Sequence, residues 1–369
     1  MAQFCSQPTS MPQSILTFPP EIIVNILSFL PVPALLKFSQ TCHYSHRLAT
    51  SSLHTLSLGI HSTKVSGIIS RLGATQFPRP KHIASAFTPP DYTASPPGPS
   101  LRSSYSTGNE SAYLDEEDFE DNDPYRVTVL IPDAQSFTYT TLLNFHTALT
   151  RSILTRHGST LRNLDLALWT LNLPVAKALC GLEALRSISL RIEDVPHVRA
   201  VPRSRVFSQR VEQREAWSLL TSNAKWAPRL NALRIEGGEM NGEQLATLLR
   251  KSRWCSELWL CKCSMIGTEL WAFLGSEFEG RSDLKILGVM RCGGQIEDET
   301  LRIIGGMTSL QFLTLQGCHL YGVESEAVEE WNRDIWRIRE CIPPQPRVEP
   351  GGESTLIEVD PAYLNAYGQ

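Results

Sequence analysis

The sequence lacks any apolar run near the length of about 20 residues that a membrane-spanning helix needs. Residues 22–30 are apolar but short, and Asn25 and Ser28 interrupt them. No Lys or Arg precedes Lys37, so the basic region of a secretory signal is missing as well. We therefore expect no membrane partner and a location in the cytoplasm, the nucleus or both.

The sequence also lacks the motifs of common catalytic sites: the Gly-x-Ser-x-Gly elbow, the phosphate-binding Gly-Lys-Ser/Thr loop and the Gly-x-Gly-x-x-Gly fingerprint. Cys42, His43 and His46 are close in sequence, but a zinc site needs about four ligands and no second pair lies nearby. We expect no metal, no cofactor and no enzymatic activity.

The cysteine count, the net charge and the chain length limit the class of protein. The nine cysteines are an odd number without a regular framework spacing, which favours reduced thiols in the cytosol or nucleus. A formal net charge of −4 gives no general attraction to nucleic acid. With 369 residues, 42% of them hydrophobic, the chain is long enough for one large or two medium domains.

What the sequence does contain begins with an amphipathic helical pair over residues 15–48. Pro19 and Pro20 open the first helix, where a missing N–H costs nothing, and Pro31 and Pro33 end it. A second helix through Cys42 follows. So small a unit cannot bury both apolar faces on itself and needs a partner. The alternative is a helical hairpin that opens a globular domain.

This spacing resembles an F-box, whose pattern is Leu-Pro-x-Glu followed by two aliphatic residues, a helix ending Ile-Leu-Ser-x-Leu, a Leu-Leu pair and a later Cys. Phe18-Pro19 occupies the position of the Leu-Pro pair in this pattern. Two positions depart from the pattern, Ala34 in place of an acid and Ser45 in place of Trp. The positions that match in register are Glu21, Ile22, Ile26, Leu27, Ser28, Leu30, Leu35, Leu36 and Cys42.

The resemblance implies a non-catalytic receptor of an SCF-type ubiquitin ligase. Residues 14–50 would then bind a Skp-type adaptor and, through it, a cullin-RING ligase, while the rest of the chain would bind a protein target for ubiquitin-dependent degradation. The adaptor-binding residues that it implies are Phe18, Pro19, Ile22, Ile26, Leu27, Leu30 and Leu35.

A Leu-x-x-Leu-x-Leu string recurs along the remaining chain. From Leu161 onward the strings begin 24, 45, 25, 29 and 26 residues apart, and all but one gap fit the period of a leucine-rich repeat. Helix-like segments lie between them. We therefore predict an α/β fold: a helical F-box and then, over residues 51–342, a right-handed leucine-rich-repeat solenoid with parallel strands and helices on the convex side. The strings begin at Leu53, Leu161, Leu185, Leu230, Cys255, Leu284 and Leu310.

Cys263, Cys292 and Cys318 each lie eight residues after the start of their string. Either they form a metal or disulfide cluster, or this position turns inward, where a small thiol packs well. Their repetition at one register favours packing. The pattern is similar to the cysteine-containing class of leucine-rich repeats.

Four segments depart from the repeat. Residues 1–13 and 343–369 have the composition of a disordered N-terminus and a tail. Residues 88–124 are Pro-rich and then acidic, which predicts a disordered insertion, either a solvated spacer or a docking segment for a basic partner. The longest gap holds an Arg-rich insertion at about 195–215, read as a charged surface loop or a phosphate-binding patch.

The candidate target site lies on the concave face of the predicted solenoid. Strand alternation places the second, fourth and sixth residues after each string's start on that face. Large apolar side chains gather there on adjacent strands, from Trp259, Ile286, Met290 and Phe312. They either form a target-binding surface or are covered by the C-terminal tail. The alternative function is a non-ligase repeat scaffold for a protein or phosphorylated partner, with the helical pair as its cap.

Overall fold

The computed structural model describes residues 18–74, 76–87, 123–193, 203–324 and 326–344. The predicted disorder at residues 1–13, nearly all of the acidic insertion and nearly all of the C-terminal tail lie outside these described residues. Within them, no helix is both long and apolar enough to span a membrane.

Three short helices open the described chain: α1 (Pro20–Leu27), α2 (Val32–Ser39) and α3 (His43–Ser52). Pro20 lies in the first turn of α1, as expected, but α1 already ends at Leu27, before Pro31. Pro33, which was expected to help end the first helix, instead lies in the first turn of α2. The expected second helix is split, because Cys42 caps α3: its Sγ accepts a hydrogen bond from the backbone N–H of Ser45 at 3.4 Å. The unit therefore has three helices instead of the predicted two.

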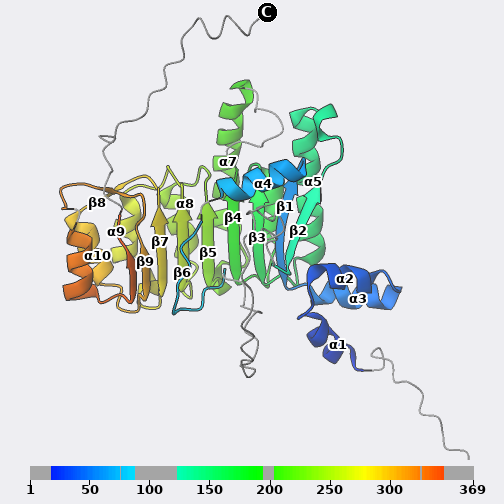
Figure 1. The fold of residues 1–369 in the computed structure, drawn as a ribbon, viewed down its shortest axis with the longest axis horizontal. Coiled ribbons are helices and arrows are strands. Elements are labelled where there is room, and N and C mark those ends of the chain that lie inside the picture. Colours follow the sequence, from blue (N-terminus) through cyan, green and yellow to red (C-terminus); the bar gives the residue numbers. More distant parts are fainter. Residues whose placement is uncertain (1–17, 75, 88–122, 194–202, 325, 345–369) are drawn as a thin grey trace, which may run out of the picture.

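The rest of the described chain is built on one parallel sheet, so the predicted fold class is confirmed (Figure 1). In space the strands follow the order β11-β9-β7-β6-β5-β4-β3-β1-β2. The strands are β1 (Thr55–His61), β2 (Arg126–Leu130), β3 (Asn163–Leu168), β4 (Ser187–Ile192), β5 (Ala232–Glu236), β6 (Glu257–Cys261), β7 (Ile286–Met290), β9 (Phe312–Thr314) and β11 (Glu340–Ile342).

The repeated strings stay in register across this sheet. Leu164 pairs with Ile188, Ile188 with Leu233, and Leu233 with Leu258, so equivalent string positions lie side by side. The exception is β2, which follows β1 in the chain but lies outside it at the edge, so that β1 pairs directly with β3.

The helices from α5 to α10 cover one side of the sheet, whereas α4 lies on the other side, where its Gly67 approaches the His61 ring of β1 (Figure 1). Each of α5 to α10 contacts the next one along the row. The helices after α3 are α4 (Lys64–Gly73), α5 (Tyr139–His157), α6 (Leu173–Cys180), α7 (Arg203–Asn223), α8 (Gly242–Leu249), α9 (Glu269–Ser276), α10 (Asp298–Gly305) and α11 (Ala327–Trp331). A second, two-stranded sheet pairs β8 (Gln295–Ile296) with β10 (His319–Leu320).

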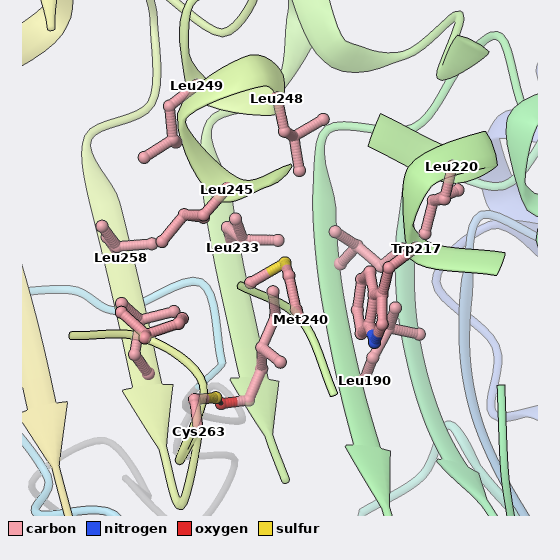
Figure 2. Close-up of a cluster of buried hydrophobic side chains, with 14 of the residues drawn as sticks. Leu190, Trp217, Leu220, Leu233, Met240, Leu245, Leu248, Leu249, Leu258 and Cys263 are labelled. Carbon is pink, nitrogen blue, oxygen red and sulfur yellow. Dashed lines mark hydrogen bonds between the residues drawn. The ribbon is translucent and has the colours of Figure 1, made fainter. Parts of the chain in front are cut away.

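The main core lies between the sheet and these helices. Figure 2 shows its central part, where Leu233 and Leu258 of neighbouring strands meet Leu245 and Leu248 of α8. Trp217 of α7 extends the same cluster. Each buried side chain of this size contributes about 1.5–3 kcal/mol, so neighbouring repeats hold each other in place.

The repeat cysteines pack inward as predicted. Cys263, Cys292 and Cys318 are buried in the main core and carry free thiols. The Sγ of Cys318 donates to the carbonyl of Val289 at 3.2 Å, in the preceding repeat. Burial raises the pKa of the Cys318 thiol to about 12.

The Arg-rich insertion is not a surface loop where it is described. Residues from Arg203 belong to α7, whose C-terminal half carries the buried Trp217 and Leu220. Arg210 and Arg214 both pair with Glu239, at 3.4 and 2.8 Å. These two guanidinium groups therefore hold a turn after β5, which argues against a free phosphate-binding patch at this place.

Candidate functional site

The first candidate surface is the outer face of the three N-terminal helices. Ile23 and Leu27 of α1 pack with Leu35, Leu48 and Ala49 into a small core of their own. The neighbouring row of α1 points the other way. It leaves large apolar side chains in solvent at Phe18, Ile22, Ile26 and Phe29.

This division corrects part of the expected adaptor site. Phe18, Pro19, Ile22 and Ile26 are exposed, as a binding role requires. Leu27 and Leu35 are 4% and 5% exposed, because they form the internal core and leave nothing for a partner to contact. Leu30 is half-buried against that core.

Other exposed apolar side chains extend the same unit and were not foreseen. Phe29, directly after α1, is 81% exposed. Leu36 of α2 and Tyr44 of α3 are also exposed. Several large apolar groups exposed on so small a domain are typical of a protein-binding surface. We call Phe18, Ile22, Ile26, Phe29, Leu36 and Tyr44 the N-terminal apolar patch.

The comparisons with known proteins coincide with this unit. Residues 15–55 match the family described as F-box-like. The three helices form an F-box-like domain. A stretch of 37 residues is 51% identical to mouse (Mus musculus) F-box only protein 24, and it spans 10% of this chain and 6% of that protein.

The chain was also found similar to a solved structure over part of its length. An internalin of Listeria monocytogenes aligns with 52% of this chain and 63% of its own, at 16% identity and a TM-score of 0.28. The fold is defined by the parallel strand order and the repeated string, which show a leucine-rich-repeat solenoid. The solenoid follows the F-box-like domain.

The second candidate surface is the front face of the sheet, opposite the helices, where the target site was expected. Trp259, Ile286 and Phe312 do gather there in one cluster, with the Trp259 and Phe312 ring centroids 5.4 Å apart. They are 0%, 2% and 1% exposed, and Met290 is buried as well. The expectation of an open apolar surface is therefore wrong.

Among the described residues, the cover is residues 76–87, which follow α4 and lie across the front face; we call them the strap (Figure 1). Nearly all of the C-terminal tail, the cover named as the alternative, lies outside the described residues. Phe77, Ile83 and Phe87 of the strap pack on the cluster, together with Ile342 of β11. Phe77 meets Trp259 edge to face, with centroids 5.4 Å apart.

Two carboxylates hold the strap by its backbone. Glu340 of β11 accepts hydrogen bonds from the N–H groups of Lys81 and His82, at 2.8 to 3.0 Å. Glu257 of β6 accepts from the Ala86 N–H at 2.9 Å and from the Ser85 hydroxyl at 2.5 Å. Charged acceptors make such hydrogen bonds short and strong.

Arg234 of β5 adds a cation to the same site. Its guanidinium lies 4.3 Å from the ring centroids of both Phe77 and Phe87, an arrangement in which a cation is attracted to the ring faces. Burial lowers the pKa of Arg234 to about 10, opposed by the neighbouring charges of Asp165, Glu257 and Glu236. The side chain stays charged at neutral pH.

The front face thus combines an apolar cluster, a buried cation and two carboxylates that accept N–H groups. None of these groups is a nucleophile–base pair. Among the described residues, no three His, Cys, Asp or Glu side chains come together as metal ligands. The arrangement fits recognition of a polypeptide segment.

Proposed function

We propose that this protein is the substrate-recognition subunit of an SCF-type ubiquitin ligase. Its F-box-like domain binds a Skp-type adaptor, which connects it to a cullin-RING ligase, and its solenoid binds the protein target. The match of residues 15–55 to the F-box-like family carries this proposal, supported by the solvent-exposed N-terminal apolar patch.

The proposed receptor makes and breaks no bonds. It raises the effective concentration of target lysines near a conjugating enzyme. We place it in the cytosol or nucleus, where the free thiols of the described cysteines remain reduced.

The adaptor interface is tested with two exposed residues of the patch. Burying Ile22 and Phe29 on an adaptor contributes about 1.5–3 kcal/mol each, so the double variant Ile22→Glu/Phe29→Glu should lose about two orders of magnitude or more in adaptor affinity. His46→Glu is the matched control, because this exposed α3 side chain lies two residues, and so about 200° around the helix, from Tyr44 of the patch. Binding is measured by co-expression with a Skp-type adaptor and by calorimetry.

The alternative, a scaffold whose helices cap the solenoid, is favoured by contacts between the two parts, such as the hydrogen bond that the Val32 N–H donates to the Pro124 carbonyl at 3.0 Å. A cap predicts no adaptor complex and a lower melting temperature when this contact is lost. Full adaptor affinity in the double variant, or no complex with the wild type, contradicts the receptor proposal.

A further inference from the structure

The strap rests on the sheet without being part of it. All strap side chains that the structure describes are exposed or half-buried, whereas Trp259, Phe312 and Glu257 beneath them are buried. The strap adds no strand to the sheet, whose order is complete without it. The surface under the strap is therefore shaped by strand pairing, and it persists when the strap leaves.

The groups that hold the strap are also positioned independently of it. The Trp259 Nε1–H donates to the Glu257 carboxylate at 2.6 Å, which fixes that acceptor from its own strand. Trp259 in turn lies over Gly288 of β7, where any Cβ would overlap its ring. The Nε of Arg234 is buried without a hydrogen-bond partner among the described residues. The site is thus pre-organised before a segment docks.

The strap itself shows which segment fits. Over residues 83–87 half-buried and exposed side chains alternate, so Ile83, Ser85 and Phe87 face the sheet while Ala84 and Ala86 face solvent. The aliphatic and aromatic side chains enter the apolar cluster, and the serine hydroxyl donates to Glu257. This is a short pattern, aliphatic-x-Ser-x-aromatic, read by side chains and by backbone N–H groups.

Charge sets a further requirement. The serine hydroxyl lies 2.5 Å from a buried carboxylate, and a phosphate there would bring about two more negative charges against it. A segment with an unmodified serine is accepted, and a phosphorylated one is repelled.

We propose that the front face between β5 and β11 is a peptide-binding site that the strap occupies as an internal substitute for a target. The target would be an unphosphorylated segment of the form aliphatic-x-Ser-x-aromatic, and it binds when the strap is displaced. The identification of this ligand as a ubiquitination target rests on the proposed function. The front-face site and its sequence preference do not.

The test displaces the strap in the full chain. Ser85→Asp places a carboxylate against Glu257, whereas Ala84→Asp, the matched control, places the same charge on the solvent side of the strap. Trypsin reports on release, because the bond after Lys81 is held by Glu340 in the docked state. We expect cleavage after Lys81 to accelerate at least about tenfold in Ser85→Asp and to remain slow in the control.

Peptide binding is then measured by fluorescence anisotropy with a labelled peptide of residues 81–87. It should bind Ser85→Asp at least about tenfold more tightly than the wild type or the control, because no strap competes. The same peptide phosphorylated at its serine should bind at least about tenfold more weakly. Adding Trp259→Ala to Ser85→Asp should abolish binding of the unmodified peptide.

Three results would overturn the proposal: a strap that stays protected in Ser85→Asp, a released strap with no peptide binding, and loss of the solenoid's cooperative melting in Ser85→Asp. Equal affinity for both peptides would overturn the serine requirement. Adaptor binding by Ser85→Asp is recorded in parallel, since its absence contradicts the receptor proposal while the peptide results still test the front-face site.

Discussion

His146 lies on the buried side of α5, 1% exposed, with its ring 5.4 Å from that of Trp169. Its Nε2 has no hydrogen-bond partner among the described residues. Burial lowers the pKa of His146 from 6.5 to about 4, partly opposed by a backbone hydrogen bond to Ala167. The ring is therefore neutral in the folded protein at pH values where it would be charged in the unfolded chain.

This shift predicts acid sensitivity. Between pH 6.5 and 4 the unfolded state binds a proton at His146 that the folded state does not, so stability falls as the pH falls. A depression of this size corresponds to about 3 kcal/mol. Urea unfolding at pH 7, 5.5 and 4 should show wild type losing about that much more free energy of unfolding than His146→Gln.

Burial also lowers the pKa of His157. This residue is present in both proteins, so it accounts for part of the pH dependence of stability that remains in His146→Gln. Equal pH slopes in the two proteins would show that His146 is not the group responsible.

At the residue scale, the sequence predicts that a helix is amphipathic better than it predicts which of its side chains face inward. In α5 the buried row is Leu142, His146, Thr150 and Leu154, whereas the large apolar Phe145 is exposed. A hydrophobic pattern cannot identify a row that contains buried polar groups. In α1 the difficulty is the opposite: both rows are apolar, so the pattern could not tell that Ile23 and Leu27, not Ile22 and Ile26, face inward.

Among the elements, α8 is an example of a helix whose N-terminus is held by a cap. Asn241 precedes α8, and its side chain accepts from the Gln244 N–H at 2.9 Å, while the Gln244 side chain accepts from the Asn241 N–H at 3.0 Å. This reciprocal pair satisfies two of the donors that a helix N-terminus leaves open.

Asn241→Ala should therefore cost about 1 kcal/mol of stability, whereas Asn241→Asp, which keeps the acceptor, should cost far less. The measurement is the midpoint and slope of chemical unfolding followed by circular dichroism. An Ala variant as stable as the wild type would mean that the cap is dispensable once α8 is packed in the row.

The strands could be predicted from the sequence because each string carries its own pattern. All seven predicted strings contribute a strand to the sheet. The outer position of β2 could not be predicted, since strand order depends on partners far away in the chain. The strap was missed for the same reason: Lys81 meets Glu340 across 259 positions, and nothing local marks its Pro-interrupted sequence as a cover.

Over the whole molecule, two hydrophobic cores of unequal size coexist. The F-box-like domain has the small core described above, and the solenoid has one continuous core from β1 to α11, with Leu53 packed against both. Small cores open at lower free energy than large ones. We therefore expect the F-box-like domain, which carries the N-terminal apolar patch, to be less stable than the solenoid.

Native-state hydrogen exchange should show this difference. Amides of α1 and α2 should exchange through openings that cost less free energy than those of β4, β5 and β6 in the middle of the sheet. Exchange is read by mass spectrometry, residue range by residue range. Uniform protection across both regions would mean that the two cores unfold as one unit.

The strap lies far along the chain from the strands that it covers, and this separation sets the order in which they are made during synthesis. A ribosome releases residues 76–87 long before it releases β6, β7, β9 and β11, on which they will lie. Contacts that far apart form last. Each newly made molecule therefore already carries the strap when its front face forms, and a segment from another protein must compete from the start with a tethered copy.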